Sequence, residues 1–131
     1  MSKQDSSSES ECHILFVEDD ADTREMVCFV LERDGYKVTC APTVAEALEL
    51  VKQEKFDLYL LDSLLSDGTG VELCQLIRGF DPHTPVVFYS GSAYEADIKK
   101  ALSAGAQDYL VKPCAIKELE ETLDKHLEDA C

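Results

Sequence analysis

The chain is poor in positive charge. Its 131 residues contain 12 lysines and arginines against 27 aspartates and glutamates, which gives a formal net charge of −15. Nucleic acids and anionic lipid surfaces are bound through basic patches, so we expect no direct nucleic-acid partner and no membrane partner. The charge favours a partner with a basic docking surface, or a site for cations.

Long apolar runs and paired-cysteine motifs are also missing. No stretch approaches the ~20 apolar residues that a membrane-spanning helix needs, and the polar, serine-rich start of the chain is not a signal peptide. Six cysteines are present, but no two have the Cys-x-x-Cys spacing of a metal or redox site. We therefore expect reduced thiols, a cytoplasmic location and a disordered acidic tail over residues 1–11.

No nucleotide-binding signature is present. Gly68-Thr69-Gly70 fails the G-x-G-x-x-G pattern because Leu73 occupies the third glycine position, and there is no P-loop. No internal repeat or linker is visible either, and the length suits one domain, which we expect over residues 12–131.

Short apolar runs alternate with amphipathic segments along the chain. Leu58–Leu61 is too short for a helix and apolar at successive positions, which is typical of a strand buried on both faces of a parallel sheet. Similar runs occupy 14–17, 37–40, 86–89 and 109–111, and segments with helical spacing separate and follow them. This alternation predicts a doubly wound α/β domain with a five-stranded parallel sheet.

Each predicted helix has one apolar face. We expect the first to run to about Arg33 and the fourth from about Tyr94 to Ala104. The residues expected on their inner faces are Met26, Val27, Val30, Leu31, Ile98, Ala101 and Leu102. Thr43 and Glu46 have the spacing of a capping box and mark the start of the second helix.

Polar residues stand where the predicted strands end. Glu18 and Asp19 follow the first strand, Asp62 the third, Ser90 the fourth and Lys112 the fifth. The carboxyl ends of parallel strands meet along one crevice, so these residues should converge. Three neighbouring carboxylates repel one another unless a cation is bound, and Mg²⁺, which prefers oxygen ligands and pairs with phosphate, fits best.

The same set suits a carboxylate that accepts phosphate. Such a site needs a nucleophile, a metal ion and donors for the transferred oxygens; here Asp62, the acids, Ser90 and Lys112 supply them. Each residue alone has a simpler explanation: the acids could favour a helix N-terminus, and Lys112 could be a solvated loop charge. Their combination, each at its own strand end, favours the site.

Four segments follow one another in the order and spacing of one known family. They are Ile14–Asp20, Leu60–Gly70, Val86–Gly91 and Gly105–Pro113. From about Cys12 to Asp129, the chain resembles the receiver domain of two-component response regulators, in the CheY-like superfamily. The resemblance implies a flavodoxin-like sheet with strand order 2-1-3-4-5 and helices on both faces.

The resemblance also implies a role for each acid. Asp62 matches the phosphorylated aspartate, which accepts a phosphoryl group from a histidine kinase or a histidine phosphotransfer protein. Asp19 matches the direct Mg²⁺ ligand, and Glu18 acts largely through water. Asp62 itself and the backbone carbonyl of Leu64 complete the metal ligands.

The remaining matches concern phosphate binding and signalling. Ser90 matches the switch hydroxyl, Lys112 the phosphate-binding lysine and Tyr109 the switch aromatic, and the resemblance implies a cis Lys112–Pro113 bond. A receiver of this kind is not an enzyme with a separate substrate; it assists its own phosphorylation and dephosphorylation. We expect a monomer when unphosphorylated, and a downstream protein that docks on the last two helices and the strand between them.

The chain departs from the receiver pattern at two positions, and other functions have to be weighed against the receiver interpretation. Ser66 stands where the family usually has proline, and Cys114 where phenylalanine is common. Against an aspartate-nucleophile phosphatase, Leu64 occupies the second acidic position of the Asp-x-Asp motif. A phosphorylation-independent scaffold, and a receiver cut from a hybrid kinase or a larger regulator, both stay open.

Overall fold

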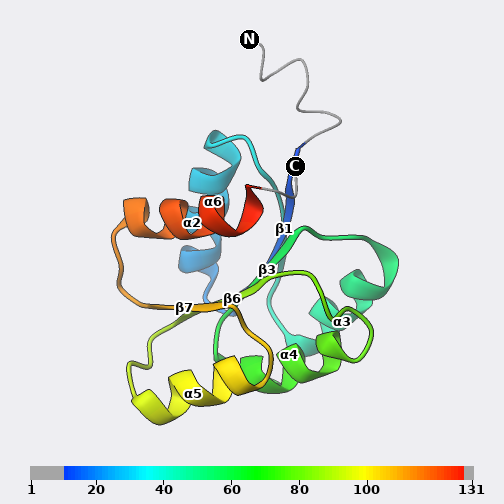
Figure 1. Cartoon of the computed structure of the whole chain (residues 1–131). Coiled ribbons are helices and arrows are strands. Elements are labelled where there is room, and N and C mark those ends of the chain that lie inside the picture. Colours follow the sequence, from blue (N-terminus) through cyan, green and yellow to red (C-terminus); the bar gives the residue numbers. More distant parts are fainter. Residues whose placement is uncertain (1–10, 129–131) are drawn as a thin grey trace.

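The computed structural model describes residues 11–128, which form a sheet with helices on both faces (Figure 1). Five parallel strands lie in the order β2-β1-β3-β6-β7. Their bounds are β1 His13–Val17, β2 Lys37–Ala41, β3 Leu58–Leu61, β6 Val86–Ser90 and β7 Asp108–Val111. This confirms the predicted doubly wound sheet of order 2-1-3-4-5. The predicted tail, residues 1–11, lies outside the described residues except for Glu11.

Helices cover both faces of the sheet (Figure 1). The helices are α2 Ala21–Arg33, α3 Val44–Gln53, α4 Gly70–Arg78, α5 Glu95–Ser103 and α6 Ile116–Leu127. Helices α2 and α6 pack on one hydrophobic core through Val27, Leu31, Leu119 and Leu123, and α3, α4 and α5 pack on a second. None of the helices within residues 11–128 is long and apolar enough to cross a membrane.

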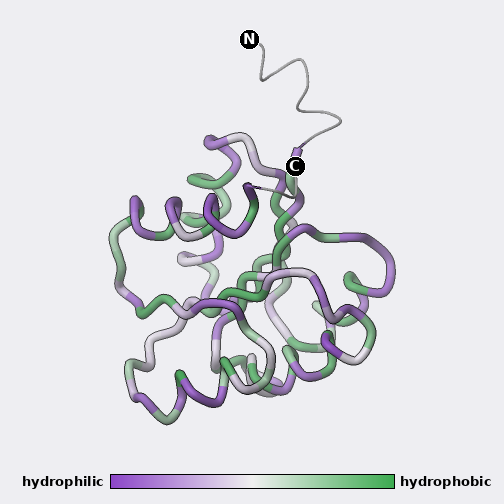
Figure 2. The backbone as a smooth tube through the Cα atoms, in the orientation of Figure 1, coloured by the Kyte–Doolittle hydropathy of each residue, from purple (hydrophilic) through white to green (hydrophobic). Residues whose placement is uncertain are grey.

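The three central strands are mostly apolar, and this accounts for their burial between the two layers of helices. Every residue of β1, β3 and β6 is buried, and Figure 2 shows hydrophobic residues concentrated in the middle strands, with alternating character in the helices. A strand covered on both faces needs apolar side chains at successive positions, which is the pattern read from the sequence. The register pairs Val17 with Leu61 and Leu61 with Phe88, so these strands end at nearly the same level.

Two predicted core residues are on the surface. Val27, Val30 and Leu31 are buried as expected, but Met26 is 43% exposed, and in α5 Ala101 is buried while Leu102 is 45% exposed. Each exposed residue is adjacent in sequence to a buried one. Because successive helical residues are ~100° apart, a neighbour of a core residue can point to solvent.

The connection between β3 and α4 contains structure that the sequence did not indicate. A short antiparallel hairpin forms from β4, Leu64–Leu65, and β5, Gly68–Thr69. A reciprocal capping box then starts α4, with Thr69 as N-cap and Glu72 as its partner. At the predicted capping box of α3, only the Thr43 side chain acts, by accepting from the Glu46 N–H.

The cysteines differ from the prediction of reduced thiols. Cys28 of α2 and Cys40 of β2 form a disulfide, whereas Cys74 and Cys114 are free. The packing of α2 on the edge strand β2 brings the two cysteines together. Their separation of 12 residues in sequence does not indicate this pairing. The prediction is therefore wrong at this pair.

Candidate functional site

The register of the parallel strands brings the predicted site residues together at one edge of the sheet. Glu18 directly follows β1 and Asp62 directly follows β3, while Ser90 is the last residue of β6 and Lys112 follows β7. Backbone hydrogen bonds level these ends: the Asp62 N–H donates to the Val17 carbonyl at 3.0 Å, and the Lys112 N–H to the Ser90 carbonyl at 2.7 Å. The predicted convergence at the carboxyl edge of the sheet is what the fold produces.

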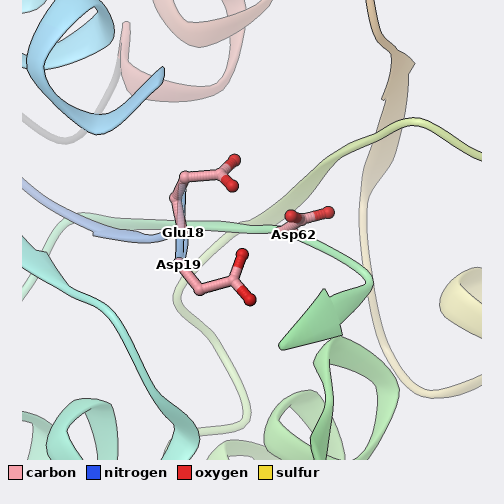
Figure 3. A group of neighbouring side chains, drawn as sticks. All are labelled: Glu18, Asp19 and Asp62. Carbon is pink, nitrogen blue, oxygen red and sulfur yellow. The ribbon is translucent and has the colours of Figure 1, made fainter. Parts of the chain in front are cut away.

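Three carboxylates form the centre of the site. One oxygen from each of Glu18, Asp19 and Asp62 lies within 4.8 Å of the others, and Figure 3 shows the three side chains approaching one another from two neighbouring strand ends. Glu18 is 1% exposed and Asp62 8%, whereas Asp19 faces solvent. The cluster is open on the Asp19 side and closed beneath by the sheet.

Lys112 is the cation of the cluster. Its Nζ lies 2.5 Å from Glu18 Oε1 and 3.4 Å from Asp62 Oδ2, and 5.2 Å from the centre of the Tyr89 ring. Burial lowers the pKa of Lys112, but the hydrogen bonds and charges of Glu18 and Asp62 outweigh it, so the pKa is raised overall. The Lys112–Pro113 peptide bond is cis, as the resemblance implied.

Glu18 is the most deeply buried of the three clustered acids. Burial raises its pKa, and the nearby Asp62 charge adds to this, while hydrogen bonding to Lys112 and the Asp20 N–H only partly opposes it. Three carboxylates and one ammonium leave a formal charge of −2 in a partly desolvated place. A group of oxygens with excess negative charge fits a hard divalent cation such as Mg²⁺.

Ser63 links Asp62 to Ser90. The Ser63 N–H donates to Asp62 Oδ1 at 2.7 Å, and its hydroxyl shares a short hydrogen bond with the Ser90 hydroxyl. Ser90 is fully buried and also accepts from the Ser92 N–H at 3.1 Å. Sequence reasoning missed Ser63, for which the only signal was its position next to Asp62.

Gly70 allows α4 to begin against the site. A Cβ at this position would lie 2.1 Å from the Asp62 carbonyl oxygen and 2.8 Å from Phe88 Cε2. The Gly70 N–H donates to the Ser63 carbonyl at 3.0 Å. Any larger residue would push the start of α4 away from the end of β3.

Tyr109 and Leu64 lie beside the cluster. The Tyr109 hydroxyl donates to the Ser92 carbonyl at 2.8 Å, and its ring stacks on Phe88 with centres 5.8 Å apart. The Leu64 side chain is 71% exposed. Both border a cavity of about 370 Å³, whose other lining residues are Ser63, Thr69, Val71, Phe88, Ser92, Asp97 and Lys100.

Comparison with known proteins gives a consistent picture. Residues 14–124 match the profile of the response regulator receiver domain. The transcriptional regulatory protein CseB of Streptomyces coelicolor is 43% identical over 101 residues, covering 77% of this chain and 43% of CseB. The sensor histidine kinase AruS of Pseudomonas aeruginosa is 38% identical over 118 residues, or 87% of this chain and 12% of AruS.

Solved structures agree. A CheY-like response regulator receiver domain from Methanospirillum hungatei JF-1 superimposes with a TM-score of 0.88 at 32% identity, covering 92% of this chain and 96% of that one. The chain spans less than half the length of the curated relatives CseB and AruS. Because the profile covers most of the chain and its relatives share more than 30% of their residues with it, the protein belongs to the response regulator receiver domain family of two-component systems.

Proposed function

We propose that the domain accepts a phosphoryl group on Asp62 from a histidine kinase or a histidine phosphotransfer protein, and that it works in the cytoplasm with that donor. The observation that carries the proposal is the position of Asp62: it ends a buried strand, lies in one cluster with Glu18 and Asp19, and has Lys112 Nζ 3.4 Å from Oδ2. No other aspartate in residues 11–128 belongs to a cluster of three possible metal ligands apart from Asp19.

The transfer step needs one nucleophile and one leaving group. An Asp62 carboxylate oxygen attacks the phosphorus of a phosphohistidine, an O–P bond forms, and the N–P bond to the imidazole breaks. The imidazole nitrogen keeps the electron pair and takes up a proton. The attacking group is the carboxylate, and Lys112 Nζ, 3.4 Å from Oδ2, holds a positive charge beside it.

Glu18, Asp19 and Asp62 would hold Mg²⁺, with the Leu64 backbone carbonyl as a further ligand. When bound, the ion offsets negative charge on the carboxylates and on the phosphoryl oxygens. The protein's own contribution is to keep three acids together at a cost in repulsion, which a bound cation removes.

Lys112 and Ser90 would contact the transferred oxygens. In the structure described, Lys112 divides its contacts between Glu18 and Asp62, and Ser90 is bonded to Ser63. A phosphoryl group on Asp62 offers new acceptors to both, so each would exchange a protein partner for a phosphoryl oxygen. This exchange of partners by Lys112 and Ser90 would be the first structural change after phosphorylation.

Ser90 and Tyr109 would carry the signal outward. Movement of Ser90 also moves its bond from the Ser92 N–H, and the Ser92 carbonyl is the acceptor of the Tyr109 hydroxyl. Tyr109 belongs to β7, so a change at its ring would shift the conformational populations of the surface formed by α5, β7 and α6. A downstream protein would dock on that surface.

The decisive experiment compares two aspartates that bracket the same strand. The protein is incubated with a small phosphodonor and Mg²⁺ and weighed by intact mass spectrometry. Wild type should gain one phosphoryl group and Asp62→Asn none, a complete loss. Asp57→Asn is the matched control, since Asp57 lies just before β3, where its carboxylate accepts from the His13 N–H at 2.8 Å; it should gain the group normally. Full uptake by Asp62→Asn would overturn the proposal.

A further inference from the structure

Asp67 joins the hairpin after Asp62 to a different helix. It lies in the turn between β4 and β5, and its carboxylate accepts two backbone hydrogen bonds, from the Val44 N–H at 2.8 Å and from the Ala45 N–H at 3.1 Å. Val44 and Ala45 are the first two residues of α3. The same bonds lower the pKa of Asp67, which keeps it ionised at neutral pH.

These two donors have no partner within their own helix. The first N–H groups of an α-helix lack intrahelical acceptors. The N-cap residue, Thr43, serves the next ones: its side chain accepts from the Glu46 N–H at 3.1 Å and its carbonyl from the Ala47 N–H. Asp67 and Thr43 therefore cap α3 together, one from a distant loop and one from the helix itself.

The hairpin needs an anchor of this kind. It has two residue pairs, Leu64 with Thr69 and Leu65 with Gly68, and an isolated two-stranded hairpin is marginally stable. Leu65 anchors one side by burial. At the other side Gly68 lies so close to α3 that a Cβ there would be 3.2 Å from Val44 Cγ2.

We propose that Asp67 is a positioning residue for the Asp62 site: by fastening the hairpin to α3, it holds the backbone at Leu64 against the acidic cluster. The inference rests on the proposed function, in which the Leu64 carbonyl is a metal ligand. Leu64 begins the hairpin, only two residues after Asp62, so freedom at the Asp67 turn becomes freedom at that carbonyl. The start of α3 thus contributes to metal binding without touching the metal.

The test measures Mg²⁺ binding directly, by isothermal titration calorimetry of the full chain. Asp67→Ala should raise the Mg²⁺ dissociation constant by about ten-fold, the lower range for the loss of a residue that orients a ligand. Asp67→Asn keeps one acceptor oxygen and should lie between Asp67→Ala and wild type. Because Asp67→Asn is the milder change, it also keeps the test valid if Asp67→Ala folds poorly.

Thr43→Ala is the matched control. It removes a hydrogen bond from the same helix N-terminus but leaves the Asp67 bonds to Val44 and Ala45 in place. Thermal melts without Mg²⁺ should therefore show a loss of stability in both Thr43→Ala and Asp67→Ala, while the Mg²⁺ dissociation constant changes only in Asp67→Ala. A merely structural role for Asp67 predicts the same Mg²⁺ affinity in both variants.

The outcomes separate this inference from the proposed function. If wild type binds Mg²⁺ and Asp67→Ala binds it equally well, the positioning role is wrong and the metal site stands. If Thr43→Ala weakens binding as much as Asp67→Ala does, the effect belongs to helix stability and the role is again wrong. If wild type itself binds no Mg²⁺, the proposed metal site fails, and this inference fails with it.

Discussion

The strand β3 has an aspartate at each end, and the two have different surroundings. Asp57, before the strand, accepts a hydrogen bond from the His13 N–H at 2.8 Å and, within residues 11–128, belongs to no cluster of three possible metal ligands. Asp62, after the strand, lies within 4.8 Å of two more carboxylates. The same residue type, five positions apart, is part of a structural contact at one end and of a charged cluster at the other.

The amino edge of the sheet is rich in polar groups that satisfy one another. The Arg78 guanidinium donates to the Gly105 carbonyl at 2.9 Å, to the Asp81 carbonyl at 2.8 Å and to the Gln107 side chain at 3.0 Å. The same Gln107 oxygen accepts from the Val86 N–H at 2.7 Å. Gly105 has a φ of 115°, and a Cβ there would collide with the Arg78 side chain.

The comparison teaches where to look for function in such a sheet. At the amino edge, the half-buried Arg78 guanidinium donates to neutral oxygens, and each of these acceptors has a partner without a ligand. At the carboxyl edge, like charges are held together and only one lysine opposes them. The acidic cluster is a candidate binding site, because a bound cation would relieve its repulsion. The Arg78 network has a structural role, because its hydrogen bonds are already satisfied.

The largest change we expect in unfolding free energy is at the amino edge. Arg78→Met removes the donors to three acceptors and should lower the free energy of unfolding by about 2 kcal/mol, because partly buried oxygens lose a charged hydrogen-bond donor. Denaturant melts would measure it. Arg33→Met is the control, because Arg33 is 56% exposed at its side chain and pairs with Glu120 at the surface; it should cost less than about 1 kcal/mol.

If Arg78→Met abolished phosphate uptake while the variant remained folded, the assignment of a purely structural role to the amino edge would be wrong. We expect uptake to persist at temperatures where the variant is native, because Arg78 contacts no member of the acidic cluster.

A smaller effect is expected from metal at the carboxyl edge. With a dissociation constant on the order of 1 mM, about 10 mM Mg²⁺ would add about 1.4 kcal/mol to the stability of wild type. Asp19→Asn should gain much less, because it removes one of the three clustered acids, and Asp57→Asn should gain as much as wild type. Thermal melts with and without Mg²⁺ measure the gains; equal gains in Asp19→Asn and wild type would rule out a specific site there.

The smallest effect concerns His13 at the amino edge. Burial is the largest cause that lowers its pKa from 6.5, and Lys37 adds to this, while Glu54 and Asp57 oppose it. As the pH falls through about 6.5, the unfolded chain therefore takes up a proton before the folded one. The contribution of His13 to stability is complete above this pH and decreases as the pH falls toward the folded-state pKa.

Denaturant melts between about pH 7.5 and 5.5 would detect this decrease, at most about 1.4 kcal/mol for each unit of pKa difference. His13→Gln removes the titration but not the backbone bond to Asp57, so its stability should change less over the same range. Parallel pH profiles of the two proteins would show that His13 does not contribute.

The sequence was sufficient for the sheet and for most of the acidic site. Five apolar runs predicted the strands because a strand buried on both faces has to be apolar throughout. Glu18, Asp19, Asp62 and Lys112 could be placed together because the carboxyl ends of neighbouring parallel strands share one edge. This placement of the four residues followed from their order along the chain alone.

The same reasoning failed where a residue's surroundings come from elsewhere in the chain. Met26 and Leu102 look like core residues by spacing, yet the orientation of their helices on the sheet buries the neighbouring residues and leaves these two exposed. The roles of Ser63 and of the Cys28–Cys40 pair were equally invisible, since each depends on a partner at least 12 positions away.

Local hydrophobicity and covalent order are enough to predict the alternation of strands and helices, the charged strand ends and the family to which they are similar. The pairing of each oxygen with its donor, in contrast, depends on tertiary packing. Asp67 is the clearest case: its neighbours in sequence indicate a turn, but its partners are two N–H groups more than 20 positions away. Such hydrogen bonds depend on how a hairpin and a helix pack, and packing is set by the whole chain.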